Sequence, residues 1–132
     1  MKVWLSYGSE HSANLVMIGR FENASEAADA LRTLERFEGQ VLEDADRGYD
    51  LGGMHERFTE GVEELIKETG VYLVPAEVPQ FGFEYRAEAS VDQVVITTDE
   101  SEVSAFVKVL LARGARVEIY SAHTHKGTGH GR

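Results

Sequence analysis

The chain contains no cysteine, so it can form neither a disulfide nor a thiolate metal site. The absence of cysteine also fits a reducing compartment such as the cytoplasm. No apolar run approaches the roughly 20 residues that a membrane-spanning helix needs. The apolar run in residues 1–7 is too short for a signal peptide. We therefore expect a cytoplasmic protein without a membrane segment.

Basic residues are also few. Lysine and arginine number 13 against 23 aspartate and glutamate residues, which gives a formal net charge of -10. Such a chain repels phosphate backbones, so we expect no nucleic-acid partner. The acidity indicates a solubilising surface, because the charges are spread along amphipathic helices. The alternative is an acidic protein-binding inhibitor of a basic partner.

The length and composition indicate one globular domain. A chain of 132 residues with 42% apolar side chains is the size of a single domain and too apolar to be disordered. We predict a domain over residues 1–121 and a polar C-terminal tail, rich in glycine and histidine, over residues 122–132.

A polar loop precedes an apolar strand near the N-terminus. Residues 7–14 read Tyr-Gly-Ser-Glu-His-Ser-Ala-Asn, and residues 15–21 read Leu-Val-Met-Ile-Gly-Arg-Phe. The second stretch is apolar enough for an interior strand. A titratable loop that leads into a central strand is a common place for a functional site in a small α/β domain.

Apolar spacings of three and four residues predict helices. Asn23 can cap the first helix, with Glu26 at its third position. Asp99 begins the third helix with the same pattern of residues. Each predicted helix ends at a glycine, which favours the left-handed conformation there. The predicted helices run from Asn23 to near Gly48, from Met54 to Gly70 and from Asp99 to Gly114.

Continuous or alternating apolar residues predict strands. Residues 71–74 are apolar and precede a proline, which is typical of a short or edge strand, and residues 76–80 form a loop. Aromatic and polar side chains alternate over residues 81–88. The predicted strands cover residues 2–7, 15–21, 71–74, 81–88, 93–98 and 115–121.

Two parts of the chain repeat the order strand, acid-capped helix, strand. When Asn23 is aligned with Asp99, Glu26 falls on Glu102 without a gap. Two such halves make a ferredoxin-like βαββαβ sandwich, an antiparallel sheet with helices on one face. We predict this α+β fold, with an extra N-terminal strand and an extra helix after the first helix.

The predicted sheet has one face without helices. Apolar strand residues such as Trp4, Phe81 and Phe83 supply more apolar area than one helical layer covers. A second copy of the chain is the simplest cover, so we predict a homodimer.

In this fold the last strand ends beside the start of the strand at residues 15–21. Glu10, His11 and His123 are then candidate catalytic acid–base groups. His11, His123 and His125 are candidate ligands of zinc or another divalent metal. The alternatives are a turn at residues 10–11 and a solvated tail. If the strand at 2–7 inserts beside residues 15–21, it displaces the last strand.

Three functions remain open. The first is a dimeric ligand-binding or regulatory module. The second is a small dimeric α/β-barrel-type enzyme that uses the histidine and glutamate groups or a bound metal, and the third is the acidic inhibitor. A small-molecule ligand is expected to contact Tyr7, Ser9, Asn14, Met17, Tyr85 and Tyr120.

The motif Tyr-Gly-Ser-Glu-His-Ser at residues 7–12, with the strand after it, resembles the start of a small uncharacterised bacterial and archaeal family. The resemblance covers the N-terminal sixth of the chain. It implies membership of a family without an assigned function, and it implies no activity.

Overall fold

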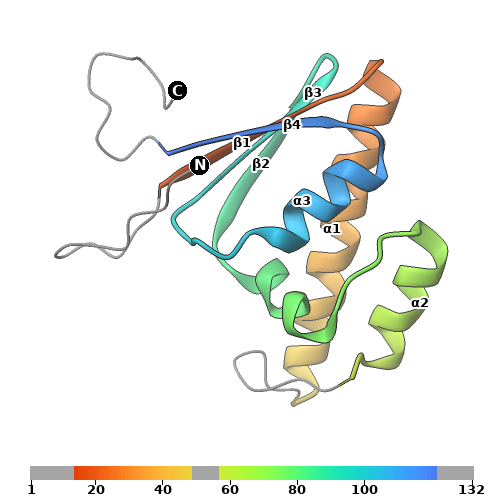
Figure 1. The fold of residues 1–132 in the computed structure, drawn as a ribbon. Helices are drawn as coiled ribbons and strands as arrows, with labels where there is room; N and C mark the ends of the chain where they lie inside the picture. The colour runs from red at the N-terminus through yellow and green to blue at the C-terminus, as the bar shows by residue number, and fades with distance from the viewer. Residues whose placement is uncertain (1–13, 49–56, 122–132) are drawn as a thin grey trace, which may run out of the picture.

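The structure is a computed structural model that describes residues 14–48 and 57–121. The predicted strand at 2–7, the start of the second predicted helix and the tail at 122–132 lie outside these residues. The elements are β1 (Leu15–Arg20), α1 (Ala24–Asp46), α2 (Glu60–Thr69), the 3-10 helix η1 (Pro75–Gly82), β2 (Tyr85–Ser90), β3 (Gln93–Thr98), α3 (Ser104–Ala112) and β4 (Arg116–Ser121) (Figure 1).

The four described strands form one antiparallel sheet in the order β2-β3-β1-β4. β1 pairs with β3 on one side and with β4 on the other along its whole length. No place beside β1 remains for another strand, so the alternative in which the strand at 2–7 displaces β4 is wrong. The predicted α+β class, with an antiparallel sheet and helices, is confirmed.

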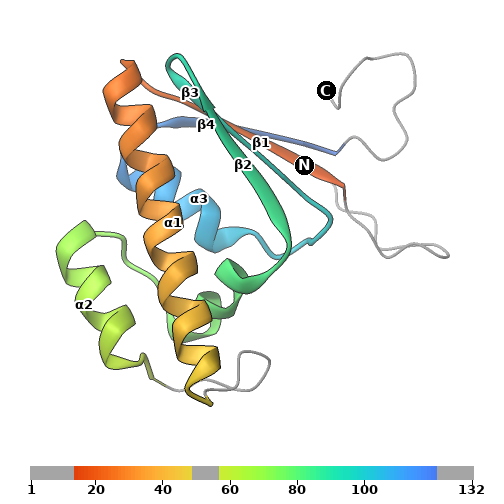
Figure 2. The same cartoon turned by 180° about the vertical axis from the view of Figure 1, so that it is seen from behind.

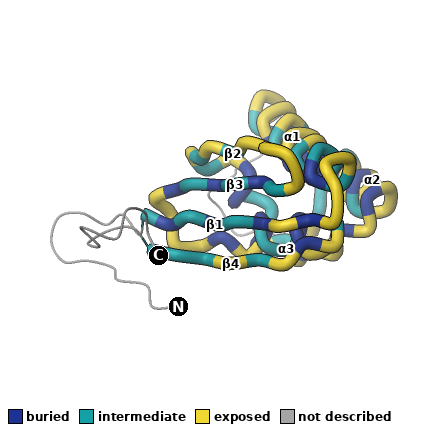
Figure 3. The backbone as a smooth tube through the Cα atoms, turned by 90° about the horizontal axis from the view of Figure 1, so that it is seen from above, coloured by how far each residue is buried: buried dark blue, intermediate teal, exposed yellow. Residues whose placement is uncertain are grey.

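Helices α1 and α3 lie on the same side of the sheet (Figures 1 and 2). The side chains of β1 follow this arrangement, because alternate residues of a strand point to opposite faces. Leu15 and Met17 are completely buried toward the helices, whereas Val16 and Ile18 are partly exposed. We call the face without a described helix the open face; Figure 3 looks onto it.

Aromatic rings fill the core between the sheet and the helices. Phe37 of α1 stacks on Phe81 of η1 with ring centroids 4.9 Å apart, and Phe81 meets the edge of Phe106 of α3 at 5.7 Å. All three rings are completely buried. Offset and edge-to-face contacts of this kind add to the stabilisation from burial. Phe81 therefore joins η1 to both main helices.

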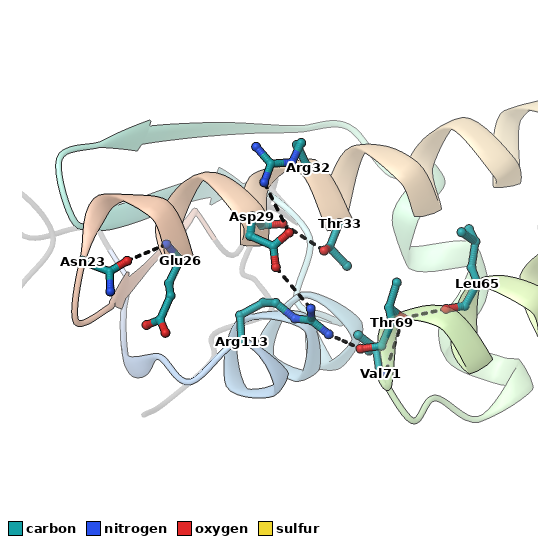
Figure 4. Close-up of polar contacts among 9 residues, drawn as sticks. All are labelled: Asn23, Glu26, Asp29, Arg32, Thr33, Leu65, Thr69, Val71 and Arg113. Atoms are coloured by element: carbon teal, nitrogen blue, oxygen red, sulfur yellow. Dashed lines mark hydrogen bonds and ion pairs between the residues drawn. The ribbon is translucent and has the colours of Figure 1, made fainter.

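The predicted cap of α1 is confirmed. The Asn23 side-chain oxygen accepts a hydrogen bond from the Glu26 amide at 2.9 Å (Figure 4), which satisfies one of the amides that a helix start leaves unpaired. Gly48, just after α1, has a φ of 101°. Glycine adopts this conformation without the steric cost that a side chain brings, so the predicted end of the helix is also confirmed.

The predicted start of the third helix at Asp99 is wrong. α3 begins at Ser104, and its first flanking residue, Val103, offers no side-chain cap. Gln80 of η1 supplies the missing acceptor, because its Oε1 accepts the Ala105 amide at 2.7 Å. A cap that comes from 25 residues away leaves no signal in the local sequence pattern.

Residues 71–82 also differ from the prediction. Residues 71–74 form no strand, and η1 replaces both the loop at 76–80 and the first part of the strand at 81–88. Side chains satisfy the amides that a sheet ladder would otherwise pair: Thr69 accepts from the Val71 amide at 3.3 Å and Glu77 accepts from the Val74 amide at 2.9 Å. Phe81 is thereby free to enter the core.

Arg113, just after α3, ties three helices together (Figure 4). Its guanidinium donates to the Asp29 carboxylate of α1 at 3.2 Å and to the carbonyl oxygen of Thr69, the last residue of α2. A cation at the C-terminal end of a helix meets unpaired carbonyls and the negative end of the dipole. This contact attaches α2 to α1 and to the end of α3. Among the described residues, no helix is both long and apolar enough to cross a membrane.

We predict that Gln80→Met lowers the free energy of unfolding by about 1–3 kcal/mol, because it leaves a buried helix amide without an acceptor at nearly constant side-chain volume. Gln93→Met is the matched control, because Gln93 is only partly buried and bonds an exposed arginine. Urea unfolding should show a lower midpoint at unchanged slope for Gln80→Met alone. Equal midpoints for the two variants would refute the cap.

Candidate functional site at one end of the sheet

Four strand ends meet at one end of the sheet. Leu15, which opens β1, pairs with Ser121 at the end of β4 and with Thr98 at the end of β3. Thr98 in turn pairs with Tyr85, which opens β2. The sequence predicted that the last strand ends beside residue 15, and the register confirms this pairing.

A cleft of about 600 Å³ lies at this end. Groups that can accept hydrogen bonds dominate it: three carboxylates, one side-chain amide and three hydroxyls accompany a single guanidinium. The lining comes from the residue before β1, from the start of β2 with the residue before it, and from the end of β3 with the two residues after it. Its residues are Asn14, Glu84, Tyr85, Arg86, Thr97, Thr98, Asp99 and Glu100.

Thr98 holds the backbone of two acidic residues of the cleft, Glu84 and Glu100, in place. It is buried, its hydroxyl donates to the Glu84 carbonyl at 3.0 Å, and the same oxygen accepts the Glu100 amide at 3.2 Å. Asn14, which also lines the cleft, precedes β1 and has a φ of 48°. Asparagine tolerates this left-handed conformation better than most residues do.

Tyr85 serves the core as well as the cleft. Its ring packs on Phe106 with centroids 4.7 Å apart, and its hydroxyl donates to the Glu38 carboxylate at 3.1 Å. Burial raises the pKa of Tyr85 well above its ordinary value, and the negative charge and hydrogen bond of Glu38 and the charge of Glu35 raise it further. The phenol therefore stays protonated near neutral pH and acts as a hydrogen-bond donor, not as a base.

The predicted ligand contacts fall in different places. Asn14 and Tyr85 share the cleft, but Met17 is completely buried in the core. Tyr120 pairs with Val16 and therefore lies on the open face, on the other side of the sheet from Met17. The structure thus brings only Asn14 and Tyr85 together among the predicted ligand contacts that it describes.

The remaining predicted site residues lie outside the described residues. They are Tyr7, Ser9, Glu10, His11, His123 and His125. All five histidines of the chain fall outside those residues, so the acid–base and metal hypotheses stay predictions. Within residues 14–48 and 57–121, no group of three or more histidine, aspartate or glutamate side chains could hold a metal ion.

A second cleft, of about 520 Å³, lies between η1 and the start of α3. Glu77 on its wall is buried, and one of its oxygens accepts both Lys108 Nζ at 2.8 Å and the Val74 amide at 2.9 Å. Burial by itself raises the pKa of Glu77, but the hydrogen bonds from Lys108, Val74 and Ser104 and the charge of Lys108 together lower it. The cleft is lined by Ala76, Glu77, Gln80, Ser101, Glu102, Val103 and Ser104.

Sequence reasoning missed this buried polar cluster. One local signal was present: Pro75 followed by an acidic residue two positions later is typical of a helix start, and Glu77 does occupy the third position of η1. The contact with Lys108 spans 31 residues of sequence, and no local pattern indicates it.

The described residues define a small α+β domain with an acidic cleft at one end of its sheet. The chain belongs to a family of unknown function (DUF6375), whose model matches residues 1–132. The resemblance at residues 7–12 implied an uncharacterised family, and this match confirms that implication over the whole length. No curated protein and no solved structure matches the chain.

We predict that Glu77→Gln destabilises the protein at pH 7 by about 1–3 kcal/mol, because Lys108 loses its buried partner. A carboxyl group whose pKa is lowered by folding stabilises the fold at pH values above its pKa in the unfolded chain. This stabilisation is lost as the pH falls through the pKa that the group has in the folded chain. The difference between wild type and Glu77→Gln should therefore shrink in urea unfolding below about pH 4. Glu63→Gln, on the exposed face of α2, is the control. A difference that is the same at pH 7 and pH 3 would contradict the ion pair.

Proposed function

We propose that the protein is a cytoplasmic, dimeric ligand-binding module with a ferredoxin-like arrangement. The observation that carries this proposal is the one-sided cover of the sheet. Described helices pack on one face only, the other presents partly exposed apolar residues, and an acidic cleft lies at one end. The absence of cysteine supports the cytoplasmic location.

The strand order supports the ferredoxin-like arrangement. Read from the opposite edge, the sheet is β4-β1-β3-β2, with α1 between β1 and β2 in sequence and α3 between β3 and β4. A βαββαβ chain with antiparallel pairing produces this pattern. In this interpretation α2 and η1 form an insertion after α1.

The open face supports the dimer. Val16, Ile18 and Val95 lie there on the two central strands and are partly exposed. The partly buried apolar residues that pack against the core include Val117 and Ile119 of β4 but none of these three. Apolar residues at the centre of a sheet gain from removal from water, and a second copy offers the same apolar surface.

The cleft favours a ligand with positive charge and hydrogen-bond donors. Its carboxylates, Glu84, Asp99 and Glu100, outnumber the single Arg86, and its amide and hydroxyl groups can accept hydrogen bonds. Small amines have this chemistry. A catalytic role would need Glu10, His11 or His123 beside the cleft, and that convergence stays a prediction.

The dimer is tested with Ile18→Lys. Ile18 is partly exposed, so the fold tolerates the change, but a charge at the centre of the open face should prevent association. Sedimentation across a wide concentration range should show dimer for wild type and monomer for Ile18→Lys. Leu111→Lys, on α3 at 54% exposure, is the matched control and should still dimerise. A wild-type chain that stays monomeric at every concentration would refute the dimer.

The ligand site is tested by calorimetric titration with spermidine as the probe. Glu100→Gln removes one carboxylate from the cleft and should weaken binding about fivefold at low salt, because close carboxylates attract an amine. Glu43→Gln makes the same change on the exposed surface of α1 and should leave the affinity unchanged. Equal affinities for the two variants would show that the net charge of the protein, not the cleft, attracts the amine.

A further inference from the structure

The open face carries its charges in an ordered pattern. The register places Arg86, Val16 and Tyr120 in one row across the sheet, because Arg86 and Val16 both pair with Thr97. The next row along the strands contains Glu88, Val95, Ile18 and Glu118. The centre of the first row is Thr97 and Val16, and the centre of the second is apolar. The edge strand β2 contributes a cation to the first row and an anion to the second.

The two charges on β2 have no ion-pair partner among the described residues. Arg86 and Glu88 are both exposed, and neither takes part in any of the ion pairs of residues 14–48 and 57–121. On β4, by contrast, Glu118 binds Arg20 at 3.4 Å. An exposed cation and anion, one row apart and unpaired within the chain, can be paired by a surface that carries the same two charges in the reverse order.

We propose that two copies pack open face to open face with their strands running in opposite directions, about a two-fold axis that lies between these two rows. This inference rests on the proposed dimer and specifies its geometry. Arg86 then faces Glu88 of the partner subunit, and the symmetry forms this pair twice. Ile18 packs against Val16 of the partner subunit, so apolar side chains of the two central β1 strands also meet.

The other two-fold arrangement of these faces is electrostatically unfavourable. An axis parallel to the strands exchanges β2 with β4 and sets each row against itself. Glu88 would then face Glu118 of the partner subunit, twice. Like charges placed against each other at an interface disfavour that arrangement. The charge pattern therefore selects the first axis.

The size of the face sets the expected affinity. Four strands of six residues span roughly 19 by 20 Å. This is less than the ~800 Å² per partner that a standard stable interface buries, so the dimer belongs to the weak class. We expect monomer and dimer to exchange within an accessible concentration range, which makes changes in Kd measurable.

The test is a charge exchange followed by sedimentation equilibrium of the full chain. Arg86→Glu and Glu88→Arg should each raise the dimer Kd about tenfold or more at low salt, because each sets like charges against each other twice. The double variant Arg86→Glu with Glu88→Arg restores opposite charges and should return the Kd to near the wild-type value. Glu43→Arg, Arg47→Glu and their combination repeat these changes within an exposed pair of α1 and should leave the Kd unchanged.

Each outcome decides the inference. If the axis ran parallel to the strands, Glu88→Arg would lower the dimer Kd, because the new side chain would face Glu118 of the partner subunit. A lower Kd for this variant would therefore overturn the proposed geometry. A dimer Kd that is the same for wild type and all the β2 variants would also overturn this geometry, while the proposed dimer itself would stand. A wild-type chain that stays monomeric would refute both the dimer and its proposed geometry. The open face would then have to be covered by another segment of the same chain. Circular dichroism of every variant confirms that the fold is intact.

Discussion

Within residues 14–48 and 57–121, helices cover only one face of the four-stranded sheet, and this one-sided cover determines which side chains are buried. Leu15 and Met17 of β1 are completely buried because they face α1 and α3, whereas Val16 and Ile18 on the same strand stay partly exposed. A central strand with apolar residues on both faces is typical of a sheet that is covered on both sides. The sequence of β1 therefore fits a sheet that acquires a second layer, and the proposed dimer supplies it.

Polar side chains hold the helical layer in place at its margins. Gln80 caps α3, Glu77 pairs with Lys108, and Arg113 joins the ends of α2 and α3 to α1. Each of these contacts connects elements that are far apart in sequence. Buried polar groups are costly unless they are paired, so these networks favour one arrangement of the helices over alternatives of similar apolar burial. The same ties hold α2 and η1 against α1 and α3.

Local patterns predicted the parts of the fold that local physics decides. The cap at Asn23 and the glycine at each helix end appear where the sequence indicates them. The prediction failed where a distant side chain replaced a local partner. Asp99 resembles a cap, but Gln80 caps the helix from η1, and Phe81 leaves the alternating strand pattern to fill the space between Phe37 and Phe106. One part of the candidate site could be predicted, because the pairing of β1 with β4 follows from the predicted topology. The carboxylates of the cleft could not, because they come together only through the register between β2 and β3.

Isotope-filtered NMR can show whether a second copy covers the open face. A mixture of labelled and unlabelled chains at high concentration reports only contacts between copies. If a second copy covers the open face, we expect intermolecular cross-peaks between the methyl groups of Ile18 and Val16. We expect none from methyl groups of the helical layer such as those of Leu34, which is completely buried. Cross-peaks confined to the helical side of the domain, or none from the open face at concentrations where the mass is that of a dimer, would contradict this arrangement.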